Sequence, residues 1–278
     1  MKRKKAWKIS WTLSLIVLIL MAAVSLVSLL FPTLYRDNAF IQAVWRGNDL
    51  VSLAAAVPVF ILGLIYSRRG SPIGELIRLG LMDYTLYNYA FYLTAASFNV
   101  LFLPYVLVIV LSAFALLTGL VSIREKEIKE HFQSQLPVRW IAVYLIFVAV
   151  GLSAVYFIQY LGFVFQGTLP DIIRKSGHVT HIVPALDLTL LVPWLVLGGV
   201  WLWQHRPWGY VVSGIKLVKG LLYTLVLTGV GFSTLKAGFP EGAAEIPLWG
   251  TLCLGFLITS GLMLAHRRRS PVDAGERT

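Results

Sequence analysis

Long apolar runs alternate with short polar stretches along nearly the whole chain. Eight of these runs are about twenty residues or longer, which is the length that an α-helix needs to cross a bilayer core of about 30 Å. They cover roughly residues 8–31, 49–67, 73–98, 100–123, 139–166, 185–204, 208–232 and 247–267. The pattern predicts an all-α integral membrane protein with eight transmembrane helices, and seven is the alternative count if one pair of runs is misread.

The composition agrees with this pattern. Of the 278 residues, 58% are hydrophobic and 13% are charged, whereas a soluble domain carries about 25% charged residues. The first run follows the basic sequence MKRKK, as in a signal peptide, but it is longer than the apolar core of a typical signal peptide. We therefore interpret it as an uncleaved membrane anchor.

The distribution of basic residues predicts the orientation of the chain. If both termini and the loops near 68–72, 124–139 and 205–207 lie on one side, that side, counting Arg78 just inside the third run, holds 17 of the 24 Lys and Arg residues, and the opposite loops hold 5. This bias follows the positive-inside rule and predicts a cell-membrane protein with cytoplasmic N- and C-termini. The net charge of +11 is therefore a topology signal. Because the basic residues are scattered over several loops, they do not indicate nucleic-acid binding.

The residue types that the sequence contains limit the chemistry that the chain can carry out. Cys253 is the only cysteine, so an intramolecular disulfide or a CxxC redox pair cannot form. The sequence shows no glycine-rich phosphate loop, and we predict no cofactor. The charged stretch at 124–138 is expected to be a connector that includes a short surface helix.

Two segments of the chain resemble each other. Residues 48–74 and 186–209 both have an Asp-Leu pair, a Val-Pro pair, an apolar stretch, a basic turn and a closing glycine. With a gap of about three residues, Asp49 aligns with Asp187. The similarity predicts two parallel four-helix repeats, residues 1–138 and 139–278, related by an axis along the membrane normal. The alternative is that Asp-Leu pairs near helix starts reflect ordinary capping.

Short motifs are spread over most of the chain. They are GND at 47–49, RRGS at 68–71, YNYAFY at 87–92, FN at 98–99, LFLPY at 101–105, LDL at 186–188 and RPWGY at 206–210. In these motifs the chain resembles a bacterial family of multi-pass membrane proteins with no assigned function. The resemblance implies a multi-pass membrane fold and implies no activity, substrate or site residue.

Asp83 stands inside the third apolar run. An ionisable side chain at bilayer depth is costly and is a functional hypothesis by default. Asp83 and Lys219 each lie about ten residues past a basic turn, which is about 15 Å along a helix, and the repeat places Asp83 opposite Val218. We expect an ion pair between Asp83 and Lys219, with Lys216 as the competing partner. Such a pair either fixes the helix register or binds a charged substrate or a proton.

Polar side chains accompany this expected pair. Tyr84, Tyr87 and Asn88 lie on the third run, and Tyr223 lies one turn beyond Lys219 on the seventh. Because a phenol or an amide in lipid needs a hydrogen-bond partner, we expect all four to face the interior of the bundle. They either hold helices together or line a polar cavity that binds a substrate or an ion.

The loops opposite the termini contain a second group of candidates. His178 and His181 are three residues apart, and Asp187 follows shortly afterwards. Two histidines and a carboxylate can bind zinc or copper, although ordinary interfacial histidines or a pH-sensitive contact are alternatives. Asp49, Asp187 and Arg46 bring mixed charge to this outer face, where they either form the mouth of a site or tie loops together.

Three functional classes are consistent with these features. The first is a permease-like protein that binds an unknown small molecule or ion between the two halves. The second is a non-transporting accessory, assembly or sensor subunit that needs a membrane protein partner. The third is an intramembrane metal-dependent enzyme that uses the histidines. A fourth arrangement, a lysine Schiff base of retinal with an aspartate counter-ion as in rhodopsins, uses the same residue types as the expected ion pair.

Overall fold

The structure is a computed structural model that describes residues 2–268. Within these residues the only β-type pairing is an isolated bridge between Phe132 and Arg267. The α-helices are α1 (Lys2–Leu30), α2 (Ala39–Val51), α3 (Val57–Arg68), α4 (Pro72–Ala95), α5 (Phe102–Ser122), α6 (Glu125–Glu130), α7 (Val138–Gln166), α8 (Asp171–Ser176), α9 (Ile182–Leu186), α10 (Val192–Trp203), α11 (Pro207–Lys236) and α12 (Gly242–Ala265). The predicted all-α class is confirmed. The basic tail beyond Arg268, which the charge pattern assigns to the cytoplasm, lies outside the described residues.

Seven helical stretches among the described residues are long and apolar enough to cross a membrane. Two of them are composite, because α2 continues into α3 over Ala39–Arg68 and α9 continues into α10 over Ile182–Trp203. The chain is therefore a multi-pass membrane protein. The predicted count of eight depends on α4, which has 24 residues but carries Glu75, Arg78 and Asp83 and is too polar to qualify by composition.

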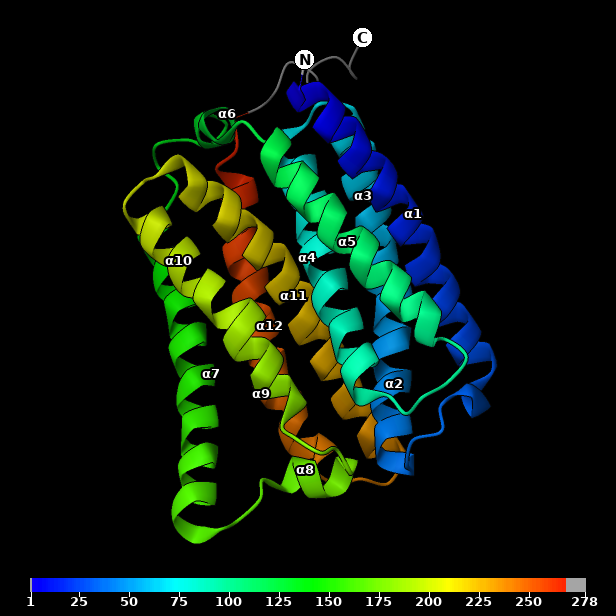
Figure 1. Ribbon diagram of the computed structural model, residues 1–278. Helices are drawn as coiled ribbons and strands as arrows, with labels where there is room; N and C mark the ends of the chain where they lie inside the picture. The colour runs from blue at the N-terminus through cyan, green and yellow to red at the C-terminus, as the bar shows by residue number, and fades with distance from the viewer. Residues whose placement is uncertain (1, 269–278) are drawn as a thin grey trace.

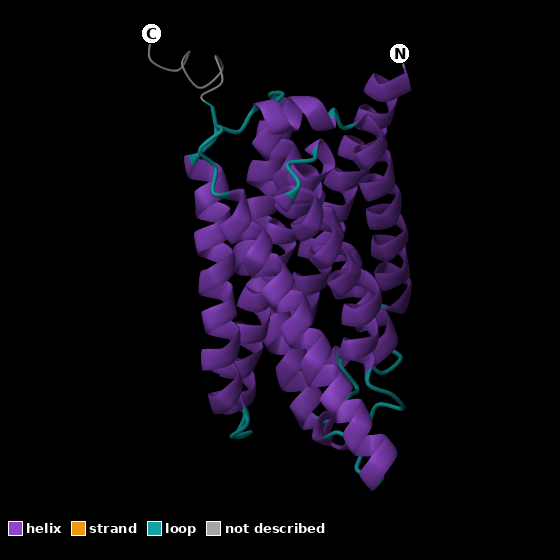
Figure 2. Ribbon diagram, turned by 90° about the vertical axis from the view of Figure 1, so that its left-hand side faces the viewer, coloured by secondary structure: helices purple, strands orange, loops and turns teal. Residues whose placement is uncertain are grey.

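The long helices stand side by side in one bundle (Figure 1). The start of α1 and the end of α12 lie at the same end of the bundle, which we call the terminal side, and α8 lies at the opposite end, which we call the far side. α1, α3 and α5 form one flank, α7, α10 and α12 form the other, and α4 and α11 lie between them. A view at right angles shows the same upright arrangement of helices (Figure 2).

α4 and α11 form the buried centre of the bundle and pack directly against each other. Glycines allow their backbones to approach closely. A Cβ on Gly80 of α4 would lie 2.5 Å from Val218, and one on Gly214 of α11 would lie 2.8 Å from Leu76. The third and seventh predicted runs are therefore neighbours, as an ion pair between them requires.

Both composite helices contain a π-helical segment at a corresponding place. The segments are Ser52–Ala56 and Asp187–Leu191, and each comes immediately before a Val-Pro pair. Proline cannot donate a backbone hydrogen bond within a helix, and a π-bulge is one way for the chain to accommodate that loss. Ser52 and Asp187 are 135 residues apart.

The same separation of 135 residues recurs in the packing of glycines. Gly63 of α3 lies against Ile77 and Arg78 of α4, and Gly198 of α10 lies against Val212 and Ser213 of α11. Gly74 and Gly209 likewise contact the ends of the preceding helices, at Tyr66 and Trp201. At this constant separation Asp187 corresponds to Ser52, and not to Asp49 as the sequence alignment with a gap predicts. Asp49 lies inside α2, ten residues after its start.

The connector between the halves lies on the terminal side. It contains the exposed helix α6, as the sequence predicts. Lys129 of α6 donates a hydrogen bond to the carbonyl oxygen of His205 at 2.8 Å. The backbone nitrogen of Gln133 donates to the carbonyl oxygen of His266, also at 2.8 Å. These contacts hold the connector across the ends of α10 and α12.

Candidate functional site

Asp83 forms a buried ion pair across the interface between α4 and α11. Its Oδ2 atom accepts a hydrogen bond from the Nζ atom of Lys216 at 2.7 Å, and the two side chains are 12% and 5% exposed. The expected ion pair therefore exists, but its partner is Lys216 and not Lys219. Lys216 lies one helical turn nearer the terminal side, and it also contacts the carbonyl oxygen of Leu190 at 3.4 Å.

Lys219 is fully buried on α11 and has no hydrogen-bond acceptor among the described residues. Its Nζ atom lies 3.7 Å from the ring centroid of Tyr87 and 5.1 Å from that of Tyr223. Aromatic faces attract a cation, most strongly when both are desolvated. The two phenol rings thus replace a carboxylate as the neighbours of this ammonium group, and its three N–H donors remain unused.

Asp187, at the start of the second π-segment, is 1% exposed and accepts hydrogen bonds from two phenols. The hydroxyl of Tyr87 donates to its Oδ1 atom at 2.6 Å, and the hydroxyl of Tyr156 donates to its Oδ2 atom at 2.5 Å. The hydroxyls of Tyr87 and Tyr223 are 3.1 Å apart. Because the single proton of Tyr87 is directed at Asp187, Tyr223 is the donor in this last bond.

Tyr87 therefore connects two buried charges of opposite sign. Its ring face contacts the ammonium group of Lys219, and its hydroxyl binds the carboxylate of Asp187. The residues come from four elements, because Tyr87 lies on α4, Tyr156 on α7, Asp187 on the π-segment after α9, and Lys219 with Tyr223 on α11. We call this group the Asp187 site. Of its members, the sequence predicts Asp187, Lys219, Tyr87 and Tyr223, but it does not indicate Tyr156.

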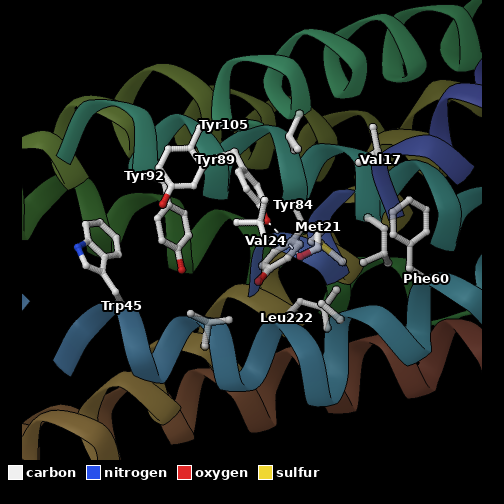
Figure 3. Packing of buried hydrophobic residues seen from close by; sticks show 14 of the residues in the cluster. Val17, Met21, Val24, Trp45, Phe60, Tyr84, Tyr89, Tyr92, Tyr105 and Leu222 are labelled. Carbon is white, nitrogen blue, oxygen red and sulfur yellow. Dashed lines mark hydrogen bonds between the residues drawn. The ribbon is translucent and has the colours of Figure 1, made fainter. Parts of the chain in front are cut away.

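Asp49, on α2, has a closely similar environment. It is 1% exposed, and it accepts hydrogen bonds from the hydroxyls of Tyr35 at 2.6 Å and Tyr92 at 2.9 Å. The ring of Trp45 stacks on both phenols, with centroid distances of 6.0 and 4.6 Å. Figure 3 shows Trp45 and Tyr92 at one end of the aromatic cluster that also contains Tyr89. Burial, followed by the charge of Asp49, raises the pKa of Tyr35 above its usual value.

Tyr84 and Asn88, two other predicted residues, join helices together. The side-chain amides of Asn48 on α2 and Asn88 on α4 exchange two hydrogen bonds, at 2.8 and 3.1 Å. Ser52 donates to the Asn48 side-chain oxygen, and its hydroxyl lies 2.8 Å from that of Tyr84. Tyr84 and Asn88 thus face the interior, as expected, where Asn88 binds α2 to α4 and Tyr84 binds the first π-segment to α4.

A second buried ion pair lies near the terminal side and was not predicted as a pair. Arg78 and Glu75 of α4 are hydrogen-bonded to each other. Arg78 also donates to Ser10 at 2.8 Å and to Ser14 at 2.7 Å on α1, and Ser67 donates to Glu75 at 2.5 Å. The serines spaced four residues apart in the first apolar run are the sequence signal that could have revealed it.

The predicted metal site does not form. Among the described residues no group of three His, Cys, Asp or Glu side chains could hold a metal ion. The ring of His178 contacts the carbonyl oxygen of Ala95 at 3.0 Å, and that of His181 contacts the side-chain oxygen of Gln159 at 3.0 Å. Asp187 is instead held by its two tyrosines. The two histidines lie between α8 and α9, and their rings contact different partners instead of converging on one point.

A cavity of about 460 Å³ lies in the far-side half of the bundle, lined by α2, α7, α8, α11 and α12 and by the segment between α8 and α9. Tyr156 and Tyr223 form part of its wall, so the cavity ends one phenol away from Asp187. At the inner end of the cavity, the hydroxyl of Tyr144 on α7 donates to the carbonyl oxygen of Leu252 on α12 at 2.6 Å. A second cavity, of about 740 Å³, borders Tyr156 on the other side of α7.

Apolar side chains flank the first cavity where α7 and α12 both line it. Phe147 and Val155 of α7 are 63% and 51% exposed, and Leu248 of α12 is 55% exposed. Both helices are among the seven that are able to cross a membrane. The exposed flanks of this cavity therefore face the lipid, and we call it the lateral cavity.

A different cleft, of about 500 Å³, lies between α1, α2 and α11 on the far side. Arg46 and Lys236 line it, and neither forms an ion pair among the described residues. Tyr35 is also part of the wall, although it is only 5% exposed. The predicted outer-face group is thus divided between the surface and the interior, because Arg46 is exposed whereas Asp49 and Asp187 are buried.

No protein-family model, curated protein or solved structure matches this chain.

Proposed function

We propose that the protein is a permease-like membrane protein whose substrate binds at the Asp187 site, between the two halves. The observation that carries the proposal is Lys219, a fully buried ammonium group with three unused donors. A buried donor without an acceptor costs about 1–3 kcal/mol or more when it is charged. A substrate that brings an acceptor atom to Lys219 removes this cost, so the site favours binding.

The surrounding hydrogen bonds favour a site that rearranges. Tyr223 separates Lys219 from the lateral cavity, and its hydroxyl is held only by Tyr87 among the described residues. Rotation of Tyr223 breaks one neutral hydrogen bond, a net cost of about 0.5–1.5 kcal/mol. The rotation opens a path from the cavity to Lys219 and Asp187. A substrate then exchanges its contacts with the cavity wall for contacts with these two charges.

The architecture that suits this function is a pair of parallel four-helix units with eight crossings. In this interpretation α4 is the eighth crossing, and it is polar because the other helices shield it from lipid. The recurring separation of 135 residues, in the π-segments and in the glycine contacts, supports a duplication. The two units meet at α4 and α11, where a carrier of this type places its substrate near the midplane.

The terminal side is cytoplasmic in this proposal, as the distribution of basic residues indicates. The test uses cysteine labelling with a membrane-impermeant reagent on intact cells. A cysteine at Val179, which is fully exposed on the far side, should react from outside, and one at Gln204, exposed on the terminal side, should not. Labelling of Gln204→Cys alone contradicts the orientation.

Transport is tested by comparing the solute content of cells and medium for cells that express wild type, Lys219→Met or Lys236→Met. Lys219→Met removes the unused donor, and Lys236→Met removes an exposed charge from the same helix as the matched control. We expect wild type and Lys236→Met to shift the same compound across the membrane and Lys219→Met to lose that shift while remaining folded. Identical profiles for wild type and Lys219→Met contradict the proposal.

A further inference from the structure

The lateral cavity has a polarity gradient along its length. Its lining on α7 runs from Phe147 to Gln159, which is about 18 Å at 1.5 Å per residue. The inner part is mainly apolar and includes Leu152, and Tyr223 borders it. The outer part contains the polar side chains of Gln159, His181 and Glu245. An elongated molecule with one apolar chain and one polar head matches this gradient, and the volume of about 460 Å³ lies within the usual range of about 300–1,000 Å³ for ligand sites.

The charge at the polar end indicates the chemistry of the head. Glu245 of α12 is half-buried, and it forms no ion pair among the described residues. Lys175, near the end of α8, is paired with Glu241 instead of Glu245. A half-buried carboxylate without a counter-ion favours a cation or a strong donor in the ligand. The head group is therefore expected to carry an ammonium group.

The Asp187 site repeats this charge pattern deeper in the membrane. It offers one carboxylate, Asp187, and one ammonium group, Lys219, on either side of the Tyr87 ring. A zwitterionic head that carries an amine and a phosphate satisfies both groups. Its amine moves from Glu245 to Asp187, and its phosphate provides the acceptor that Lys219 lacks. A head with a negative charge alone satisfies only Lys219.

We propose that the lateral cavity binds a single-chain phospholipid with an amine-bearing head, which enters from the bilayer between α7 and α12. Its chain lies along the apolar inner part of the cavity, and its ammonium group faces Glu245. That this lipid is the transported substrate rests on the proposed function. Its binding in the cavity does not, because binding is measured without transport.

Two matched substitutions distinguish lipid that is bound in the cavity from lipid that is bound on the protein surface. Gly151 lines the cavity, and a Cβ built on it meets no atom within 4 Å. Gly151→Trp thus fills the cavity without a clash at the backbone. Gly250 of α12 has the same open surroundings but borders none of the cavities described above, so Gly250→Trp is the control. Glu245→Gln removes the charge that the ammonium group is expected to contact.

The experiment is native mass spectrometry of the delipidated full-length protein with three added probes. They are lysophosphatidylethanolamine, lysophosphatidylglycerol, which lacks the amine, and glycerophosphoethanolamine, which lacks the chain. We expect wild type and Gly250→Trp to bind one lysophosphatidylethanolamine at least tenfold more tightly than either other probe. Gly151→Trp should lose this binding, and Glu245→Gln should lose the preference for the amine.

Three results overturn the proposal. Equal binding to wild type and Gly151→Trp shows that the lipid lies on the protein surface. Equal or tighter binding of lysophosphatidylglycerol by wild type removes the role of Glu245. Absence of binding to wild type, together with a solute shift that depends on Lys219, shows that the cavity inference is wrong while the proposed function stands. Lipid binding that is lost in Gly151→Trp, without any transport that depends on Lys219, supports the cavity and contradicts the function.

Discussion

The two buried aspartates, Asp49 and Asp187, have the same kind of hydrogen-bond partners but different surroundings. Each is 1% exposed and accepts hydrogen bonds from two tyrosine hydroxyls. Around Asp49 both phenols are buried and stacked on Trp45, and Tyr92 borders none of the cavities described above, whereas Tyr35 forms part of the wall of the cleft between α1, α2 and α11. Around Asp187 one phenol, Tyr156, is only partly buried and borders two cavities.

The difference shows how one arrangement serves two purposes. A carboxylate whose donors are locked by packing has no room to exchange partners, so the Asp49 group fixes α2 against α4. A carboxylate whose donor borders open space can exchange that donor for a ligand at little cost. The cation near the second site, Lys219, reinforces the difference, because no lysine or arginine forms an ion pair or hydrogen bond with Asp49 among the described residues.

The largest expected effect is on folding stability at the locked site. Asp49→Ala leaves the buried hydroxyls of Tyr35 and Tyr92 without an acceptor, at about 1–3 kcal/mol each, or about 2–6 kcal/mol in total. Asp187→Ala should cost less, because Tyr156 can turn into the cavity and Tyr87 keeps its contact with Tyr223. Thermal unfolding in detergent measures both variants. Equal losses of stability contradict the comparison.

The next effect concerns a third buried aspartate, Asp83, which contacts a cation directly. Asp83→Asn or Lys216→Met breaks the ion pair and leaves one buried charge alone, at about 3–5 kcal/mol. The double variant removes both charges and should recover part of the loss. A double variant that is no more stable than the worse single variant contradicts a structural role for the pair. The same unfolding assay gives all four values.

A smaller effect is a pH dependence of the folding stability on the side of the lateral cavity. His181 borders the lateral cavity, and burial lowers its pKa below the ordinary value. Because the unfolded chain then takes up the proton first, stability should be complete above about pH 6.5 and fall as the pH drops below it. Wild type should therefore lose thermal stability between about pH 7.5 and 5.5, and His181→Gln should lose less. The same pH dependence in both proteins contradicts this origin.

Much of the fold could be predicted from the sequence because hydrophobic length is a local property. The apolar runs predict the long helices, and Asp83 with its lysine partner could be expected from equal depth. The choice of Lys216 over Lys219 could not, because one helical turn is about 5.4 Å and the predicted boundaries are no more accurate than that. The start of α2 at Ala39, ten residues before the predicted run, was hidden because its polar face packs inside the bundle.

The donors to the two aspartates could not be predicted for a different reason. Tyr35 lies in the loop after α1, and Tyr156 lies in an apolar helix 31 residues before Asp187. Their contacts depend on how helices far apart in the chain pack, and single-sequence patterns do not contain that information. The π-segments were equally hidden, although the Val-Pro pairs that accompany them are visible in the sequence.

The central claim is that Tyr156, a donor to Asp187, is reached from the lateral cavity, whereas Tyr92, a donor to Asp49, is enclosed by packing, and it has a direct test. Tyr156 and Tyr92 donate equivalent hydrogen bonds to the two aspartates, so each is replaced by cysteine in a protein whose only native cysteine is removed by Cys253→Ser. A membrane-permeant maleimide is added to the folded, detergent-solubilised variants. We expect Tyr156→Cys to be labelled much faster than Tyr92→Cys. Equal labelling rates, or faster labelling of Tyr92→Cys, would contradict the account.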